Sequence, residues 1–126
     1  MKSIIKIFAV IMIMVSFIVS GCQSNEEKYT QLKTETVKLA EATWKESLSD
    51  AGYKPSNEDI VREYGKGLKI LNEKMPTIEK NAKAMEELAK SEIKLANDYH
   101  EFEKTYIVRL RERQKKYKGY VDKYSK

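Results

Sequence analysis

Residues 77–124 read TIEKNAKAMEELAKSEIKLANDYHEFEKTYIVRLRERQKKYKGYVDKY and contain no proline and one glycine, Gly119. Apolar side chains recur in this segment every three or four residues, as they do on one face of an α-helix. The pattern predicts a last helix from about Thr77 to Tyr124, which would be about 72 Å long at 1.5 Å per residue. Glu92 and Arg113 interrupt the apolar line, so the segment is not an uninterrupted leucine zipper. The line consists of Ile78, Ala82, Met85, Leu88, Leu95, Tyr99, Phe102, Tyr106, Leu110, Tyr117, Tyr120 and Tyr124.

A first helix is expected nearer the N-terminus. Ser24 or Asn25 can cap its beginning, and its apolar stripe has the same helical spacing as far as Leu48. Gly52 and Pro55 mark the one clear loop, at residues 50–57. The stripe consists of Tyr29, Leu32, Thr36, Val37, Leu39, Ala40, Thr43, Trp44, Ser47 and Leu48.

A second helix is expected after Ser56, which forms the start of a capping box with Asp59. Pro76 leaves two interpretations of its end open. Proline suits the first position of a helix, so the chain can turn at Pro76 and begin the last helix there. The apolar rhythm also crosses Pro76 unbroken, which fits a continuous helix with a kink. The apolar line of the second helix is Ile60, Tyr64, Leu68, Leu71 and Met75.

These elements predict an all-α fold, either a helical hairpin or a three-helix antiparallel bundle with a long C-terminal helix. Beyond residue 21 the chain is polar and rich in lysine, so it can bury only a narrow core. A deep catalytic cleft of the α/β type is therefore not expected. A homodimer that covers the overhanging part of the long helix is compatible with the pattern.

The N-terminus has the three parts of a secretory signal peptide. Lys2 and Lys6 are followed by an apolar run, and small residues come directly before Cys22. The stretch from Ile4 to Val19 would be about 24 Å long as a helix. A bilayer core is about 30 Å thick, so this stretch is a poor membrane span.

The sequence Val19-Ser20-Gly21-Cys22 resembles the lipobox of bacterial lipoproteins. The resemblance implies that residues 1–21 are a signal peptide, that Cys22 receives a diacylglyceryl group, and that cleavage leaves Cys22 as the N-terminus, where an N-acyl chain can be added. The mature domain, residues 22–126, would then be anchored to the extracytoplasmic face of the cell membrane. Two acyl chains suffice for stable anchoring.

Charge is concentrated at the C-terminus. Residues 109–126 carry eight basic and two acidic side chains, whereas the remainder of the mature chain is mildly acidic. This basic tail can be a solvated helix end, favoured by the helix dipole. It can also bind anionic lipid or wall polymer, or dock to an acidic protein. Its tyrosines could stack on nucleic acid bases, a use that the extracytoplasmic location disfavours. The candidate partner-binding residues are Trp44, Arg109, Arg111, Arg113, Lys115, Lys116, Tyr117 and Tyr120.

Residues that could carry out catalysis are scarce. Cys22 is the only cysteine and His100 the only histidine. A ferritin-like metal helix would need a glutamate at position 97, where the chain has Asn97. No metal ligand set, catalytic residue or cofactor is predicted apart from the lipid on Cys22, and the chain is not expected to be an enzyme.

The Gly-Cys lipobox and the small, charged helical body resemble the exclusion lipoproteins of Gram-positive integrative and conjugative elements. This resemblance implies a surface lipoprotein that blocks redundant conjugative transfer by acting on a membrane component of the incoming transfer machinery. The alternative is a structural lipoprotein whose basic C-terminal helix binds anionic wall polymer or lipid.

Overall fold

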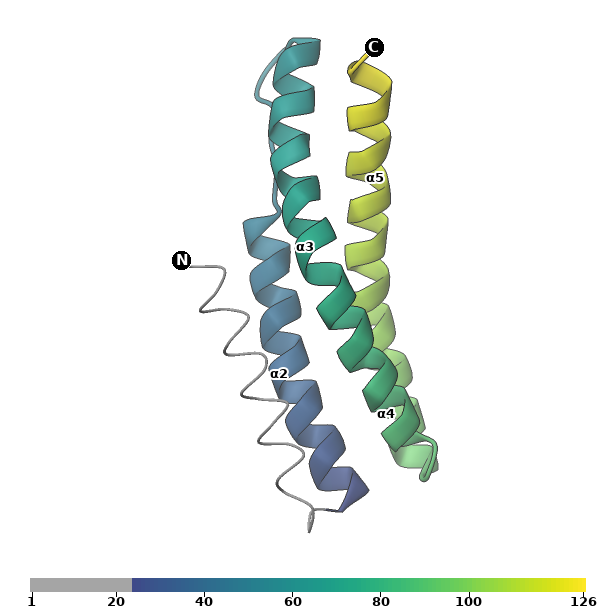
Figure 1. Ribbon diagram of the computed structural model, residues 1–126. Coiled ribbons are helices and arrows are strands. Elements are labelled where there is room, and N and C mark those ends of the chain that lie inside the picture. Colours follow the sequence, from purple (N-terminus) through teal and green to yellow (C-terminus); the bar gives the residue numbers. More distant parts are fainter. Residues whose placement is uncertain (1–23) are drawn as a thin grey trace.

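The computed structural model describes residues 24–126, which form three antiparallel arms without any strand (Figure 1). The first arm is α2 (Asn25–Glu46) and the second is α3 (Asn57–Ala89). The third arm comprises α4 (Ile93–Phe102), the π-helical turn η1 (Glu103–Ile107) and α5 (Val108–Tyr124). The all-α prediction is confirmed, as a three-helix bundle with a long C-terminal arm. The predicted lipobox, Val19 to Cys22, lies outside the described residues.

Both predicted helix beginnings are confirmed. The hydroxyl oxygen of Ser24 accepts a hydrogen bond from the backbone N–H of Glu27 at 3.2 Å, which caps α2. Ser56 and Asp59 form the reciprocal capping box of α3, since each side chain accepts a hydrogen bond from the other residue's backbone N–H. These caps depend on residues three apart in sequence, so local chemistry fixes where the helices begin.

Pro76 lies inside α3, so the prediction of a helix beginning at Thr77 is wrong. The proline is on the exposed side of the helix, whereas Met75 and Ile78 are buried in the core. The helical hydrogen bond that Pro76 cannot donate is therefore lost on the exposed side of α3, and the apolar face of the helix continues past it to Ala89. Of the two interpretations of Pro76, the continuous helix is the correct one.

The chain reverses instead at residues 90–92, without glycine, proline or asparagine. The hydroxyl of Ser91 donates a hydrogen bond to the carbonyl oxygen of Leu88 at 3.0 Å, which satisfies one carbonyl at the end of α3. Glu92 is extended, with φ −145° and ψ 134°, and its carbonyl accepts the first hydrogen bond of α4, from Ala96. The turn thus falls where Glu92 interrupts the apolar line.

The third arm contains a π-helical turn. The N–H of Val108 bonds to the carbonyl of Glu103, five residues earlier rather than four. Phe102 and Ile107 are both buried in the core although they are five residues apart. In a regular α-helix such residues would point about 140° apart, and the wider turn brings them back to one face. Ile107 therefore occupies the core position that the sequence pattern assigned to Tyr106, which is only half-buried.

The arms differ in length. α2 ends partway along α3, whereas α5 lies beside α3 as far as the end of the bundle (Figure 1). This end is opposite the one where α2 begins. The connection from α2 to α3 passes close to α3 at Gly67. A Cβ atom there would lie 2.5 Å from the carbonyl oxygen of Ser47 and 2.8 Å from a ring carbon of Tyr117. Gly67 thus permits the close approach of this connection and of α5, whereas nothing lies within 4 Å of a Cβ placed at Gly65.

We expect Gly67→Ala to lower the free energy of unfolding by about 2 kcal/mol, because overpacking outweighs the gain in helix propensity. The matched control is Gly65→Ala in the same helix, which should gain up to about 1 kcal/mol. Urea unfolding followed by circular dichroism measures both. An equal gain for the two variants would contradict the close approach at Gly67.

Deletion of Thr105, an exposed residue of η1, should leave a regular α-helix with Phe102 and Ile107 still on the core face. The free energy of unfolding should then change by less than about 1 kcal/mol. Deletion of Lys115, an exposed residue of the regular helix α5, should rotate Tyr117 about 100° out of the core and cost about 3 kcal/mol. The same unfolding measurement distinguishes the two. Similar losses would show that η1 does not accommodate an extra residue.

Candidate functional site

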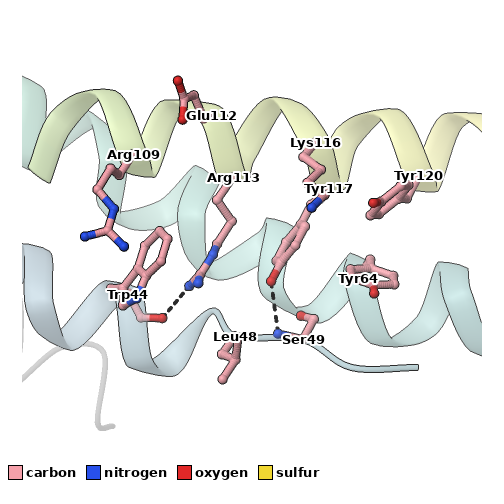
Figure 2. A pocket seen from close by; sticks show the side chains of 10 residues that line it. All are labelled: Trp44, Leu48, Ser49, Tyr64, Arg109, Glu112, Arg113, Lys116, Tyr117 and Tyr120. Atoms are coloured by element: carbon pink, nitrogen blue, oxygen red, sulfur yellow. Dashed lines mark hydrogen bonds between the residues drawn. The ribbon is translucent and has the colours of Figure 1, made fainter. Parts of the chain in front are cut away.

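A groove of about 390 Å³ lies between the end of α2, the following loop, α3 and α5 (Figure 2). It combines basic and aromatic side chains, with one carboxylate at its edge. Leu48 lies at the groove and is 70% exposed to solvent. The lining residues are Trp44, Leu48, Ser49, Tyr64, Arg109, Glu112, Arg113, Lys116, Tyr117 and Tyr120.

The indole ring of Trp44 is at the centre of the basic part of this groove. The guanidinium carbon of Arg113 is 3.3 Å from the ring centroid, and that of Arg109 is 4.7 Å from it. Figure 2 shows the ring between the two guanidinium groups. Cation–π contacts of this kind are each worth about 0.5–2 kcal/mol, more when the site is shielded from water. The two arginines thus hold the ring in place.

Arg113 also provides a hydrogen-bond donor to a backbone carbonyl at the end of α2. Its Nη1 donates hydrogen bonds to the carbonyl oxygen of Trp44 and, at 3.1 Å, to the hydroxyl oxygen of Ser47. Carbonyls in the last turn of a helix lack intrahelical partners, and a cation there is favoured by the helix dipole. Partial burial lowers the pKa of Arg113 from its ordinary value. The group nevertheless stays charged, since arginine is not deprotonated in proteins.

The basic residues of the tail lie on different sides of α5, and some of them face the groove while others do not. Arg109, Arg113 and Lys116 share the side of α5 that faces the groove. Within residues 24–126, no carboxylate oxygen lies within 4.0 Å of their side-chain nitrogens. Arg111 instead pairs with Glu79 of α3 at 2.8 Å, and Lys118 pairs with Asp122 at 3.0 Å. Arg109, Arg113 and Lys116 are therefore cations of the tail that face the groove without a carboxylate partner among the described residues.

Three tyrosines form the other end of the groove. The ring of Tyr64 on α3 packs edge-on against Tyr117, with centroids 5.0 Å apart. The same ring packs at a tilt against Tyr120, with centroids 4.8 Å apart. The hydroxyl oxygen of Tyr117 accepts a hydrogen bond from the backbone N–H of Ser49 at 3.1 Å, which fastens the loop to α5. Tyr117 is only 5% exposed, so its main contribution is to hold this wall together.

A second hollow of about 270 Å³ continues from the first and shares Trp44 and Arg109 with it. It extends along α2 and the third arm to Tyr106, whose hydroxyl donates a hydrogen bond to Glu41 at 3.4 Å. Trp44 therefore lies where the two hollows meet. The π-helical turn contributes Thr105 and Tyr106 to the second hollow, in keeping with the frequent occurrence of such turns at functional sites.

Most of the candidate residues from the sequence come together here. Trp44 and the groove-facing cations meet in space with Tyr117 and Tyr120, although the two sets are more than 60 positions apart in sequence. Arg111 and Lys115 do not line the groove. The sequence reasoning missed Tyr64 and Leu48, which it assigned only to apolar lines. The interruption of the apolar line at Arg113 was the available signal, because a charge on a core-facing side needs polar partners there.

The sole histidine is in a different part of the bundle. His100 is exposed on α4, and nearby Asp98 accepts hydrogen bonds from Tyr29 and Lys33 of α2, both at 2.8 Å. The salt bridge to Lys33 helps to hold the pKa of Asp98 below its ordinary value. Among residues 24–126 no cluster of three or more potential metal ligands occurs. Asp98 thus ties α4 to α2.

None of the helices formed by residues 24–126 combines the length and the apolar character needed to cross a membrane. Comparison with known proteins finds no matching family model, no matching curated protein and no matching solved structure.

Proposed function

We propose that this chain is a membrane-anchored surface lipoprotein that acts as a protein-interaction module, and that it excludes redundant conjugative transfer by acting on a membrane component of the transfer machinery. The observation that carries the proposal is the Trp44 ring between Arg109 and Arg113. Neither guanidinium group has a carboxylate oxygen within 4.0 Å in the described part of the chain.

The composition of the groove supports recognition of another protein. Tryptophan, tyrosine and arginine are the residues most enriched among those that dominate binding energy at protein interfaces. Here Trp44, Tyr64 and Tyr120 lie beside two arginines, and the exposed Leu48 adds apolar surface. The rings and guanidinium groups already contact one another, so little side-chain freedom remains to be lost on binding.

The leader supports the proposed location. The lipobox Val19-Ser20-Gly21-Cys22 places the lipid two residues before Ser24, where the structure begins to describe the chain. The anchor would therefore be near the beginning of α2, with the C-terminus at the opposite end of the bundle (Figure 1). The conjugative setting comes from the resemblance to small exclusion lipoproteins.

One observation favours the envelope-binding alternative. Five lysines of the C-terminal segment are exposed, so an anionic wall polymer could bind them: Lys115, Lys116, Lys118, Lys123 and Lys126. Most of these lie outside the groove. The two functions would thus share only Lys116 among these lysines, and substitution of the others can separate them.

A mating experiment tests the exclusion proposal. Recipient cells that express the chain should acquire a conjugative element at least tenfold less often than cells with an empty vector. Cys22→Ser should restore transfer, because it removes the lipid attachment site. Arg113→Gln should also restore transfer, whereas Arg111→Gln, the matched control outside the groove, should still exclude. Transfer that is unaffected by the wild-type chain would rule out exclusion.

The envelope-binding alternative makes a different prediction. The Cys22→Ser chain should then bind purified cell walls in a salt-sensitive manner. Replacement of Lys115, Lys118 and Lys123 by glutamine should abolish that binding, and Arg113→Gln should not. A sedimentation assay with purified walls measures it.

A further inference from the structure

The charges that line the groove are unbalanced. Arg109, Arg113 and Lys116 provide three positive charges, and Glu112 provides the only negative one. No salt bridge joins Glu112 to any of the three within residues 24–126. An anionic ligand would therefore be attracted to a surface where partial desolvation strengthens the interaction.

The arginines retain most of their hydrogen-bonding capacity. A guanidinium group has five N–H donors in a fixed fork. Arg113 uses only Nη1 in its bonds to Trp44 and Ser47, so its Nε and Nη2 donors remain. Arg109 makes no hydrogen bond within the described part of the chain, and its guanidinium group lies over the Trp44 ring. Each group can thus bind a carboxylate through two parallel hydrogen bonds.

The separation of Arg109 and Arg113 determines how far apart the carboxylates of a bound partner must be. Arg109 and Arg113 are four residues apart on a regular helix, so their Cβ atoms are about 6 Å apart. Acidic residues four apart on a partner helix have the same separation. The two guanidinium carbons lie 3.3 and 4.7 Å from the centroid of the same indole ring, so the flexible side chains of two such glutamates can meet both groups at once.

The apolar part of the groove distinguishes a protein ligand from a simple polyanion. Leu48 and the rings of Tyr64 and Tyr120 line the groove beside the cations. A polyglycerol phosphate chain has no side chain to cover these groups. An acidic helix with leucine on the same face covers them and removes apolar surface from water.

We propose that the groove binds an acidic amphipathic helix of a partner protein, with two carboxylates one turn apart on Arg109 and Arg113 and an apolar side chain against Leu48. This inference rests on the proposed function, since it specifies the partner of the same site. It adds the chemistry that the partner must present.

Trp44 is the only tryptophan in the chain and lies at the centre of the site, so its fluorescence reports binding directly. The full lipidated chain, purified in non-ionic detergent micelles, is titrated with a 16-residue helical peptide that carries glutamates four apart and leucines on the same face. We expect a saturable change in Trp44 emission. A peptide with glutamine in place of each glutamate should require at least tenfold higher concentration.

Substitutions locate the binding. Arg109→Gln and Arg113→Gln should each weaken binding of the glutamate peptide at least tenfold, and Arg111→Gln should change it less than twofold. Arg109 is exposed and makes no hydrogen bond within residues 24–126, so its variant tests the site even if Arg113→Gln fails to fold. The absence of a saturable change, or equal effects of Arg109→Gln and Arg111→Gln, would overturn the proposal.

Polyglycerol phosphate, and phosphatidylglycerol added to the same detergent micelles, serve as competing ligands. Tighter binding of either one, with the same dependence on Arg109, would show that the groove takes a polyanion and not a helix. The two proposals also fail in distinguishable ways. If the peptide binds but the wild-type chain leaves conjugative transfer unchanged, exclusion is wrong and the groove assignment stands. If the chain excludes but the peptide does not bind, the groove assignment is wrong.

Discussion

The contact of Arg113 with Trp44 and with the end of α2 is the interaction on which the arrangement of the site depends. One guanidinium group stacks on the indole ring, bonds to the carbonyl of the same residue and bonds to Ser47. It thereby joins the last turn of α2 to the middle of α5. Without it, the carbonyl of Trp44 would lose this charged donor, and the loop that follows would lose its fixed starting point.

Two further features place Arg113 where it can make this contact. The π-helical turn lets both Phe102 and Ile107 reach the core, which sets the rotation of α5 about its own axis. Gly67 lets the loop and Tyr117 lie directly against α3. The groove is therefore bordered by regular helices and a fastened loop, and its shape is largely formed before any ligand arrives.

The features that could be predicted from the sequence are those set by neighbouring residues. The caps at Ser24 and Ser56 and the apolar faces of the helices depend on spacings of three and four. The reversal at residues 90–92 could not be located, because this segment has no glycine, proline or asparagine and a single serine, Ser91, is a weak turn signal. Trp44 and the basic tail were identified as candidates from the sequence. The sequence could not show which basic residues of the tail face the groove. Arg111, for example, forms a salt bridge with Glu79 of another helix, a contact that depends on the fold.

The length of α2 has a geometric consequence for the proposed lipoprotein. Trp44 lies in the last turns of a helix that begins at Asn25, so at 1.5 Å per residue it is about 30 Å along the bundle axis from that beginning. A chain tethered at Cys22 can thus present its groove about 30 Å above the bilayer. At that height it can reach an extracytoplasmic domain or a long loop of a membrane protein, but not a segment buried among lipid chains. The length of the first helix then limits the partners to proteins that project far enough from the membrane to reach the groove.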